Sequence, residues 1–299
     1  MEELSSSLSK LNIGLNRNTI DKFYTKPEIV SECLDLFDEH IKFQKNSSNI
    51  LIEPAAGNGA FLKQLVTRYL SFGVIIRGYD IAPEQPYIIK QDYLQINTDK
   101  LAEPDNHIHV IGNPPFGRQS SLAKQFIKKS AIYADSISFI LPKSFKKISY
   151  NTVFPLCFHM VECVDLPALS FLVNNVEQDV PCVFQIWIRK NTDRITAEPI
   201  QPPNYIQYVK SNEKPDIAIR RVGVYAGQLY KILDNKSPQS HYFIRLLNFK
   251  KANIDSFVKK YNTNPPWKNM DNTVGPKSIS KPELNAYLSS LNIKEIINN

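Results

Sequence analysis

The chain has 299 residues, 42% of them hydrophobic, and a formal net charge of +7. This length suits one large domain or two modest ones, each with a core of its own. No apolar run approaches the ~20 residues that span a bilayer, and residues 1–20 lack the apolar segment of a secretion signal. We therefore expect an intracellular protein, cytoplasmic or nuclear, that is neither secreted nor held in a membrane.

The first part of the chain alternates helical and strand patterns. Residues 1–20 are polar and predict a flexible arm. Residues 26–43 predict a helix, because apolar side chains recur at helical spacing after a proline. A strand is expected at 47–54, an amphipathic helix at 59–73 and a second strand at 74–81.

The alternation continues and then changes. Residues 107–113 and 136–142 predict strands, and residues 121–134 between them predict a helix. Strands that alternate with helices at this pitch indicate right-handed βαβ units in a parallel sheet. The next two strands, 158–167 and 180–190, are joined by a loop without a helix, which favours an antiparallel hairpin at the sheet edge. The predicted class is α/β, a Rossmann-like and mostly parallel sheet.

The last third of the chain is loop-rich and basic. Residues 191–299 hold 16 Lys and Arg against 9 Asp and Glu, which accounts for the whole net charge of +7. They also hold 11 Phe, Tyr and Trp, and a basic segment with interleaved aromatics indicates a phosphate-binding surface. A basic domain without such a role is the alternative. Strands are expected at 218–230 and 240–250, and "NPPW" at 264–267 predicts a turn with an aromatic anchor.

The turn after the first strand predicts a ligand site. Glu53 ends that strand, and Gly57 and Gly59 follow before a helix, at the edge where doubly wound folds bind ligands. A dinucleotide site would have a third glycine where Leu62 stands, and Glu53 would repel a pyrophosphate. The carboxylate suits a cation instead, such as the amino group of S-adenosylmethionine.

Two more acidic residues follow the next strand units. Asp80 is placed to accept hydrogen bonds from two ribose hydroxyls, and Asp92 from an adenine amine. Three carboxylates around a glycine turn suit a neutral or cationic nucleoside better than a phosphate.

"NPPF" at 113–116 follows another strand and raises a question of chemistry. Pro114 and Pro115 supply no N–H and fix φ, while Asn113 before them is pushed to extended geometry. The Asn113 oxygen and the Pro114 carbonyl can accept both hydrogens of a planar NH₂ group, which localises its lone pair. Phe116 can stack on a base, an interaction worth about 1–3 kcal/mol.

Three motifs together resemble the amino-methyltransferases that methylate adenine N6. They are "FYTKPEIV" (23–30), "EPAAGNGAFL" (53–62) and "NPPF", and the resemblance covers residues 20–190. It implies a class I methyltransferase domain over residues 21–195, with S-adenosylmethionine as cofactor and catalysis by Asn113, Pro114, Pro115 and Phe116. The implied cofactor-binding residues are Tyr24, Thr25, Glu53, Ala55, Gly57, Gly59, Asp80, Ile81, Asp92, Tyr93 and Asn113.

The same resemblance implies nucleic acid as the partner, recognised by residues 196–299, and it leaves any protein partner unknown. DNA is slightly favoured over RNA. Phe stands in place of Tyr at the last "NPPF" position, so the choice between the two polymers stays open. The expected substrate-binding residues are Phe116, Lys143, Phe171, Arg220, Arg221, Lys250 and Lys251.

Two other functions stay open. A protein glutamine methyltransferase presents the same planar NH₂ to the same motif, and an inactive relative could bind nucleic acid or stabilise a partner. No metal is expected, because the four cysteines form no C-x-x-C pair and the five histidines lack ligand spacing. The cysteines are predicted to be free thiols.

Overall fold

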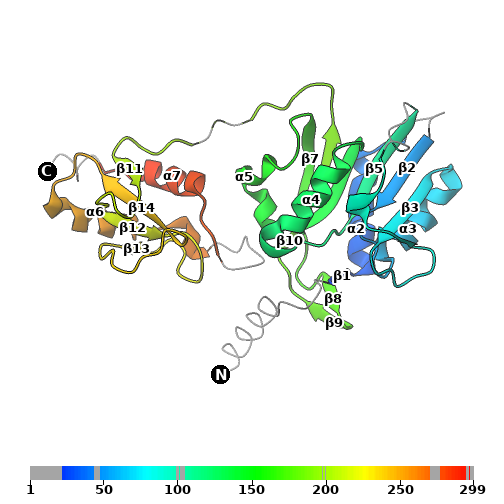
Figure 1. Ribbon diagram of the computed structural model, residues 1–299, viewed down its shortest axis with the longest axis horizontal. Helices are drawn as coiled ribbons and strands as arrows, with labels where there is room; N and C mark the ends of the chain where they lie inside the picture. Colours follow the sequence, from blue (N-terminus) through cyan, green and yellow to red (C-terminus); the bar gives the residue numbers. More distant parts are fainter. Residues whose placement is uncertain are drawn as a thin grey trace. The chain divides into compact units, whose positions relative to one another are not determined.

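The computed structural model describes residues 22–43, 48–98, 101, 105–196, 198, 200–269, 277–293 and 296. The predicted arm, residues 1–20, lies outside the described residues. The chain divides into two compact units between Ile195 and Thr196 (Figure 1), and each unit is described by itself.

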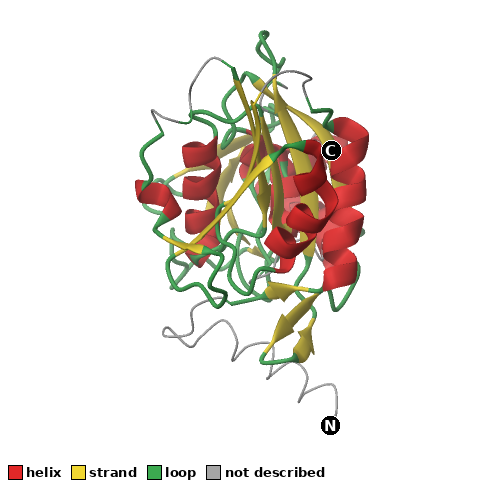
Figure 2. Cartoon of the chain, turned by 90° about the vertical axis from the view of Figure 1, so that its right-hand side faces the viewer, coloured by secondary structure: helices red, strands yellow, loops and turns green. Residues whose placement is uncertain are grey.

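A seven-stranded sheet forms the centre of the first unit, in the order β4-β3-β2-β5-β6-β10-β7 (Figures 1 and 2). Neighbours are parallel except at β10, which runs antiparallel to both β6 and β7. This confirms the predicted Rossmann-like α/β fold, a mostly parallel sheet with an antiparallel edge hairpin. The strands are β2 (Ser48–Glu53), β3 (Ile75–Asp80), β4 (Ile89–Lys90), β5 (Asn106–Gly112), β6 (Ser136–Pro142), β7 (Phe158–Asp165) and β10 (Cys182–Arg189).

The helices of this unit are α2 (Pro27–His40), α3 (Ala60–Tyr69), α4 (Ser121–Ser130) and the short α5 (Ile148–Asn151). Pro27 begins α2, where its missing N–H costs no hydrogen bond. The apolar side of α2 is buried, as its spacing predicts, through Ile29, Val30, Cys33, Leu34 and Phe37. All residues of β6 are buried, which is typical of a central strand covered on both faces.

The segment between β7 and β10 contains more structure than the loop expected from its sequence. Residues 171–178 form a hairpin of β8 (Phe171–Val173) and β9 (Val176–Gln178), and β8 pairs with β1 (Tyr24–Thr25). Asn174 and Asn175 make the turn with positive φ, a conformation that Asn tolerates. Strands of three residues are too short to show a clear alternation. The hairpin ties β1 to the rest of the unit.

The second unit has a four-stranded antiparallel sheet in the order β11-β14-β12-β13. The predicted strand at 218–230 is in fact two strands, because Gly223 and Gly227 take positive φ and turn the chain between them. The elements are β11 (Ile206–Val209), β12 (Ile217–Arg220), β13 (Leu229–Tyr230), β14 (His241–Leu246), α6 (Ile254–Tyr261) and α7 (Lys281–Ser290).

Most aromatic residues of this unit form its core and not a binding surface. Tyr205, Phe257, Tyr261, Trp267 and Tyr287 belong to one buried cluster. Trp267 is 5% exposed, which confirms the aromatic anchor predicted for "NPPW". The expected surface of interleaved aromatic rings is therefore wrong for these residues, since burying large rings stabilises a small unit.

Arg194 closes the end of the first unit and generates a stability prediction. Its guanidinium donates to the carbonyls of Asn151 (2.6 Å), Phe154 (2.9 Å), Pro155 (2.5 Å) and Phe158 (2.7 Å).

We expect Arg194→Ala to lower the free energy of unfolding by about 2 kcal/mol, because hydrogen bonds from a charged donor are lost. Urea unfolding measures this. Arg194→Lys should recover only part of the loss, and an unchanged midpoint for both variants would contradict the prediction.

Candidate active site

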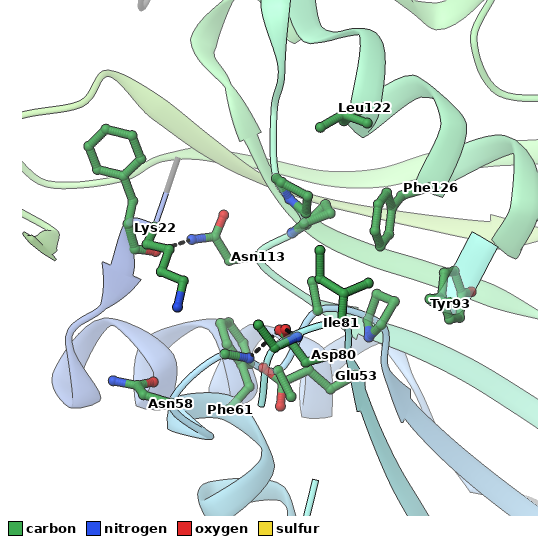
Figure 3. Close-up of a pocket in the computed structure, with 18 of the residues that line it drawn as sticks. Lys22, Glu53, Asn58, Phe61, Asp80, Ile81, Tyr93, Asn113, Leu122 and Phe126 are labelled. Atoms are coloured by element: carbon green, nitrogen blue, oxygen red, sulfur yellow. Dashed lines mark hydrogen bonds between the residues drawn. The ribbon is translucent and has the colours of Figure 1, made fainter. Parts of the chain in front are cut away.

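A cavity of about 290 Å³ lies at the carboxyl ends of β2, β3 and β5 (Figure 3). This is the edge where parallel α/β sheets bind ligands. All residues that line it belong to the first unit. The predicted site residues among them are Tyr24, Thr25, Glu53, Ala55, Gly57, Asp80, Ile81, Asp92, Tyr93, Asn113, Pro114, Pro115 and Phe116.

Three predicted residues of the first unit do not line the cavity. Gly59 is the N-cap of α3. Lys143 lies 3.6 Å from the carboxylate of Asp165, so it is ion-paired. Phe171, expected to stack on a target base, is fully buried and contacts Phe23 edge-on, because the pairing of β8 with β1 places it in the core.

The other four predicted residues lie in the second unit. Arg220 ends β12 and Arg221 follows it, while Lys250 and Lys251 lie in the exposed segment before α6. Arg220 and Arg221 each donate from Nε to a backbone carbonyl, those of Val222 and Gln239.

Asp80 holds the glycine turn that the sequence predicts as a ligand site. Its carboxylate accepts hydrogen bonds from the backbone N–H of Gly57 (2.7 Å) and of Ala82 (2.8 Å), one on each oxygen (Figure 3). A carboxylate has about four acceptor sites, so further bonds from a ligand's hydroxyls remain possible. Gly57 has φ +52°, and a side chain there would press on the Tyr24 ring at 3.2 Å. The turn therefore requires glycine.

A second contact that the sequence did not predict holds the same turn from outside. The Glu84 carboxylate accepts from the Tyr24 hydroxyl and from Lys22 Nζ (3.0 Å), and the Glu84 N–H donates to the Gly57 carbonyl (3.1 Å). The hydrogen bonds from Tyr24 and Lys22 lower the pKa of Glu84. Tyr24 thereby covers the glycine turn, and no sequence motif marks Glu84 for this role.

Glu53 is a buried carboxylate whose second oxygen has no partner. Its side chain is 2% exposed and lines the cavity, and Oε2 makes no hydrogen bond among the described residues. Burial, assisted by the nearby charge of Asp80, raises its pKa well above the usual value of 4.5. A buried carboxyl oxygen without a hydrogen-bond partner is costly, and a cationic group placed against it would remove this cost.

Asn113 is fixed in one orientation. Its amide nitrogen donates to the carbonyl of Phe23 (3.1 Å) and to the hydroxyl of Thr25 (3.2 Å). A carbonyl can only accept, so the amide cannot be flipped without setting two oxygens against each other. Both amide hydrogens are used in these bonds (Figure 3 shows the bond to Phe23), so the oxygen of Asn113, a residue that lines the cavity, remains as an acceptor.

An aromatic wall extends from the "NPPF" motif. Phe116 lines the cavity but is only 8% exposed, and its carbonyl accepts from Leu122 N (3.1 Å) and Ala123 N (3.3 Å) at the start of α4. Phe126 lies one helical turn after Leu122 and stacks on Tyr93 with ring centroids 5.5 Å apart. Leu122 and Phe126 were missed from sequence, although their i, i+4 spacing after "NPPF" is consistent with one helix face.

Two residues of the cavity rim suit a base. Ile81 is 63% exposed although it lines the cavity, so an apolar side chain is left for a ligand to cover. Asp92 caps the short helix Tyr93–Gln95 by accepting from Leu94 N (2.9 Å). Only one of its oxygens is used in this bond, which leaves the other for an exocyclic amine.

The described residues hold no group of three or more His, Cys, Asp or Glu that could bind a metal ion. All four cysteines are free thiols, as predicted. Within the described part of the chain, no helix has the length and apolar character needed to cross a membrane.

Comparisons with known proteins found similarity only among solved structures. No protein-family model and no curated protein matches the chain. A Listeria monocytogenes protein assigned as a class I S-adenosylmethionine-dependent methyltransferase is 16% identical, with a TM-score of 0.43, over 64% of this chain and 68% of its own. A type I restriction-modification methyltransferase subunit of Streptococcus thermophilus is 14% identical, with a TM-score of 0.43, over 82% of this chain and 54% of its own.

A Pyrococcus horikoshii protein assigned as an RNA methyltransferase is 12% identical, with a TM-score of 0.36, over 58% of this chain and 90% of its own. At these values the similarity carries no conclusion about the site, whose chemistry follows from its own residues.

Glu53 generates a stability prediction that needs no ligand. Because its pKa is raised, the Glu53 carboxyl keeps its proton in the folded protein at pH values where it is ionised in the unfolded chain. The free energy of unfolding therefore falls as the pH rises above about 4.5. We expect Glu53→Gln to raise the stability of the ligand-free protein at neutral pH by about 1–2 kcal/mol. The gain should shrink toward pH 4, where the carboxyl is protonated in both states.

Thermal unfolding across this pH range measures the gain. Glu84→Gln is the control, because the pKa of Glu84 is lowered, and this variant should lose stability. A loss of stability in Glu53→Gln at neutral pH would contradict the prediction.

Proposed function

We propose that the chain is an S-adenosylmethionine-dependent methyltransferase that methylates the N6 amine of adenine in nucleic acid. The observation that carries this is the fixed Asn113 amide, whose two hydrogens are used within the protein and whose oxygen remains as an acceptor on a residue that lines the cavity. An acceptor held in this way suits a neutral NH₂ group, because it binds hydrogen atoms and offers none. The stiff "NPPF" backbone beside it adds the Pro114 carbonyl as a second acceptor.

The cavity residues fit S-adenosylmethionine. The unpaired Glu53 carboxylate suits the ammonium of the methionyl tail. Asp80 retains acceptor sites for the ribose hydroxyls, and Asp92 and Ile81 suit the adenine edge and face. When bound, this cofactor supplies an electrophilic methyl group on a sulfonium.

The chain's own residues then prepare the nucleophile. An adenine amine is weakly nucleophilic because its lone pair is delocalised into the ring. Hydrogen bonds from the amine to the Asn113 oxygen and the Pro114 carbonyl favour a tetrahedral nitrogen with a localised lone pair. The two acceptors are already in place, so little reorganisation is needed. The proton leaves to water after transfer, when the nitrogen is cationic, and no strong base is needed.

The target base reaches such a cavity only when it is flipped out of its stack. The excess positive charge of residues 191–299 supports a polyanionic substrate. DNA and RNA both satisfy this charge, so both belong in the assay.

Asn113→Ala tests the proposed chemistry. We expect methyl transfer to fall by about 100-fold or more, with cofactor affinity little changed, because the amide acts on the target amine. Single-turnover transfer to adenine-containing DNA and RNA oligonucleotides, together with calorimetric titration of the cofactor, measures both quantities.

Asp80→Ala is the converse control and should weaken cofactor binding by about tenfold, which is about 1.4 kcal/mol. A large loss of cofactor affinity in Asn113→Ala would show that the motif is misassigned. Transfer to a glutamine-containing peptide and not to oligonucleotides would favour the alternative amide substrate. Absence of any thermal shift with S-adenosylmethionine would favour an inactive relative.

Cofactor binding should depend on pH through Glu53. Because burial raises the pKa of the empty site's carboxyl and a bound ammonium favours its ionised form, binding releases a proton. We expect affinity to rise with pH above 4.5 until the carboxyl of the free protein is itself ionised, and to fall at pH values above about 7.7, where the α-amino group deprotonates. Calorimetry in buffers of different ionisation enthalpy measures the released proton. Glu53→Gln should remove both effects, and an unchanged pH profile would exclude Glu53 as the ammonium partner.

A further inference from the structure

The turn between β12 and β13, residues 222–227, presents two apolar side chains to solvent. We call it the Tyr225 turn. Val224 at its tip is 80% exposed and Tyr225 is 63% exposed. Every other aromatic side chain that the structure describes in the second unit is buried or half-buried. An exposed ring in a unit that buries its aromatics calls for a ligand to cover it.

The Tyr225 turn is held by its own backbone. Gly227 N donates to the Arg220 carbonyl (2.6 Å), and Ala226 N donates to the Gly223 carbonyl (2.9 Å). Gly223 N donates to the carbonyl of Lys277, a residue far along the chain (2.8 Å). The exposed side chains are thus carried by an ordered turn, so little conformational entropy is lost when they bind.

Two side chains brace the turn from beneath. Gly227 lies against the buried ring of Trp267, and a Cβ at Gly227 would come within 2.0 Å of that ring. The "NPPW" segment therefore supports the Tyr225 turn. Arg220 donates from Nε to the Val222 carbonyl (3.0 Å), and its guanidinium lies 6.0 Å from the centre of the Tyr225 ring.

The surroundings of the turn are cationic. The ion pair seen in the described part of the unit, Lys231 with Asp255, involves neither Arg220 nor Lys236. Lys236 Nζ lies 4.1 Å from the centre of the Tyr230 ring. Arg220 and Lys236 both lie near His241, where burial first and then their charges lower the pKa of that imidazole. A protein surface that binds an apolar partner alone would not need this accumulation of positive charge. An aromatic ring among cations matches the face of a base and its phosphates.

We infer that the Tyr225 turn is a nucleic-acid contact in which Tyr225 stacks on a base while Arg220 and Lys236 meet phosphates. Both cations lie on the same face of the sheet as His241. The inference rests on the proposed function and assigns its second unit a specific contact. Rigid apolar side chains that enter a base stack are a known way to unstack and bend nucleic acid. Such a contact would stabilise a substrate whose target base has left the stack.

Oligonucleotide binding by variants of Tyr225 tests the inference. We expect Tyr225→Ala to weaken binding of fluorescein-labelled single-stranded and duplex oligonucleotides by about tenfold in anisotropy titrations. Tyr225→Phe should bind as the unchanged protein does, because it keeps the ring. Ile232→Ala is the matched control, since Ile232 is 74% exposed in the same unit but lies outside the turn.

The salt dependence separates stacking from charge. Tyr225→Ala should leave the slope of log Kd against log salt unchanged, whereas Lys236→Ala should reduce it by about one. A 2-aminopurine base in the oligonucleotide should be quenched by the unchanged protein and by Tyr225→Phe, and less by Tyr225→Ala. Equal binding by Tyr225→Ala and Ile232→Ala would overturn the inference.

The two proposals fail in different ways. If the unchanged protein methylates oligonucleotides and Tyr225→Ala alters neither affinity nor KM, the contact is wrong and the proposed function stands. If the unchanged protein neither binds nor methylates any oligonucleotide, both are wrong. If Tyr225→Ala raises KM only for a peptide substrate, the turn binds protein and the nucleic-acid contact is overturned.

Discussion

The chemistry proposed for this chain depends on the two hydrogen bonds by which the Asn113 amide donates to Phe23 and Thr25. They use both hydrogens of the amide and leave its oxygen as an acceptor. Neither partner is near Asn113 in the chain, and both lie at β1, whose position depends on pairing with β8. The hairpin of β8 and β9 does not line the cavity, but Phe171 contacts Phe23 and pairs with Thr25, so the hairpin supports Asn113 indirectly.

The glycine turn is also held in place by hydrogen bonds to side chains distant in sequence. Asp80 holds it from within, and Glu84 holds it from outside through the Gly57 carbonyl and Tyr24. Beneath the turn, Glu53 keeps an unpaired carboxyl in a buried position. Burial of this carboxyl is unfavourable, and the ammonium group of the proposed cofactor would relieve it.

In the second unit, most aromatic side chains are buried, whereas the charged side chains lie at the surface. Its rings build a compact core around Tyr261 and Trp267, and its excess of lysine and arginine remains outside. Tyr225 is the exception, carried on a turn that the same core supports through Gly227. The Trp267 ring that supports this turn also belongs to the core, so a substitution of Trp267 would affect both the stability of the unit and the position of Tyr225.

Sequence patterns alone determined the main strands and helices of the first unit, its antiparallel edge, the free cysteines and thirteen of the residues that line the cavity. This was possible because hydrophobic periodicity is local and because "NPPF" and the glycine turn carry their constraints within a few residues. Only the tertiary structure decided that Phe171 is buried, that Lys143 is ion-paired, and that most aromatics of the second unit form its core. It also decided the orientation of the Asn113 amide and the role of Glu84. These depend on contacts between residues up to 90 positions apart, and no local pattern of side chains encodes which distant partner a buried group will meet.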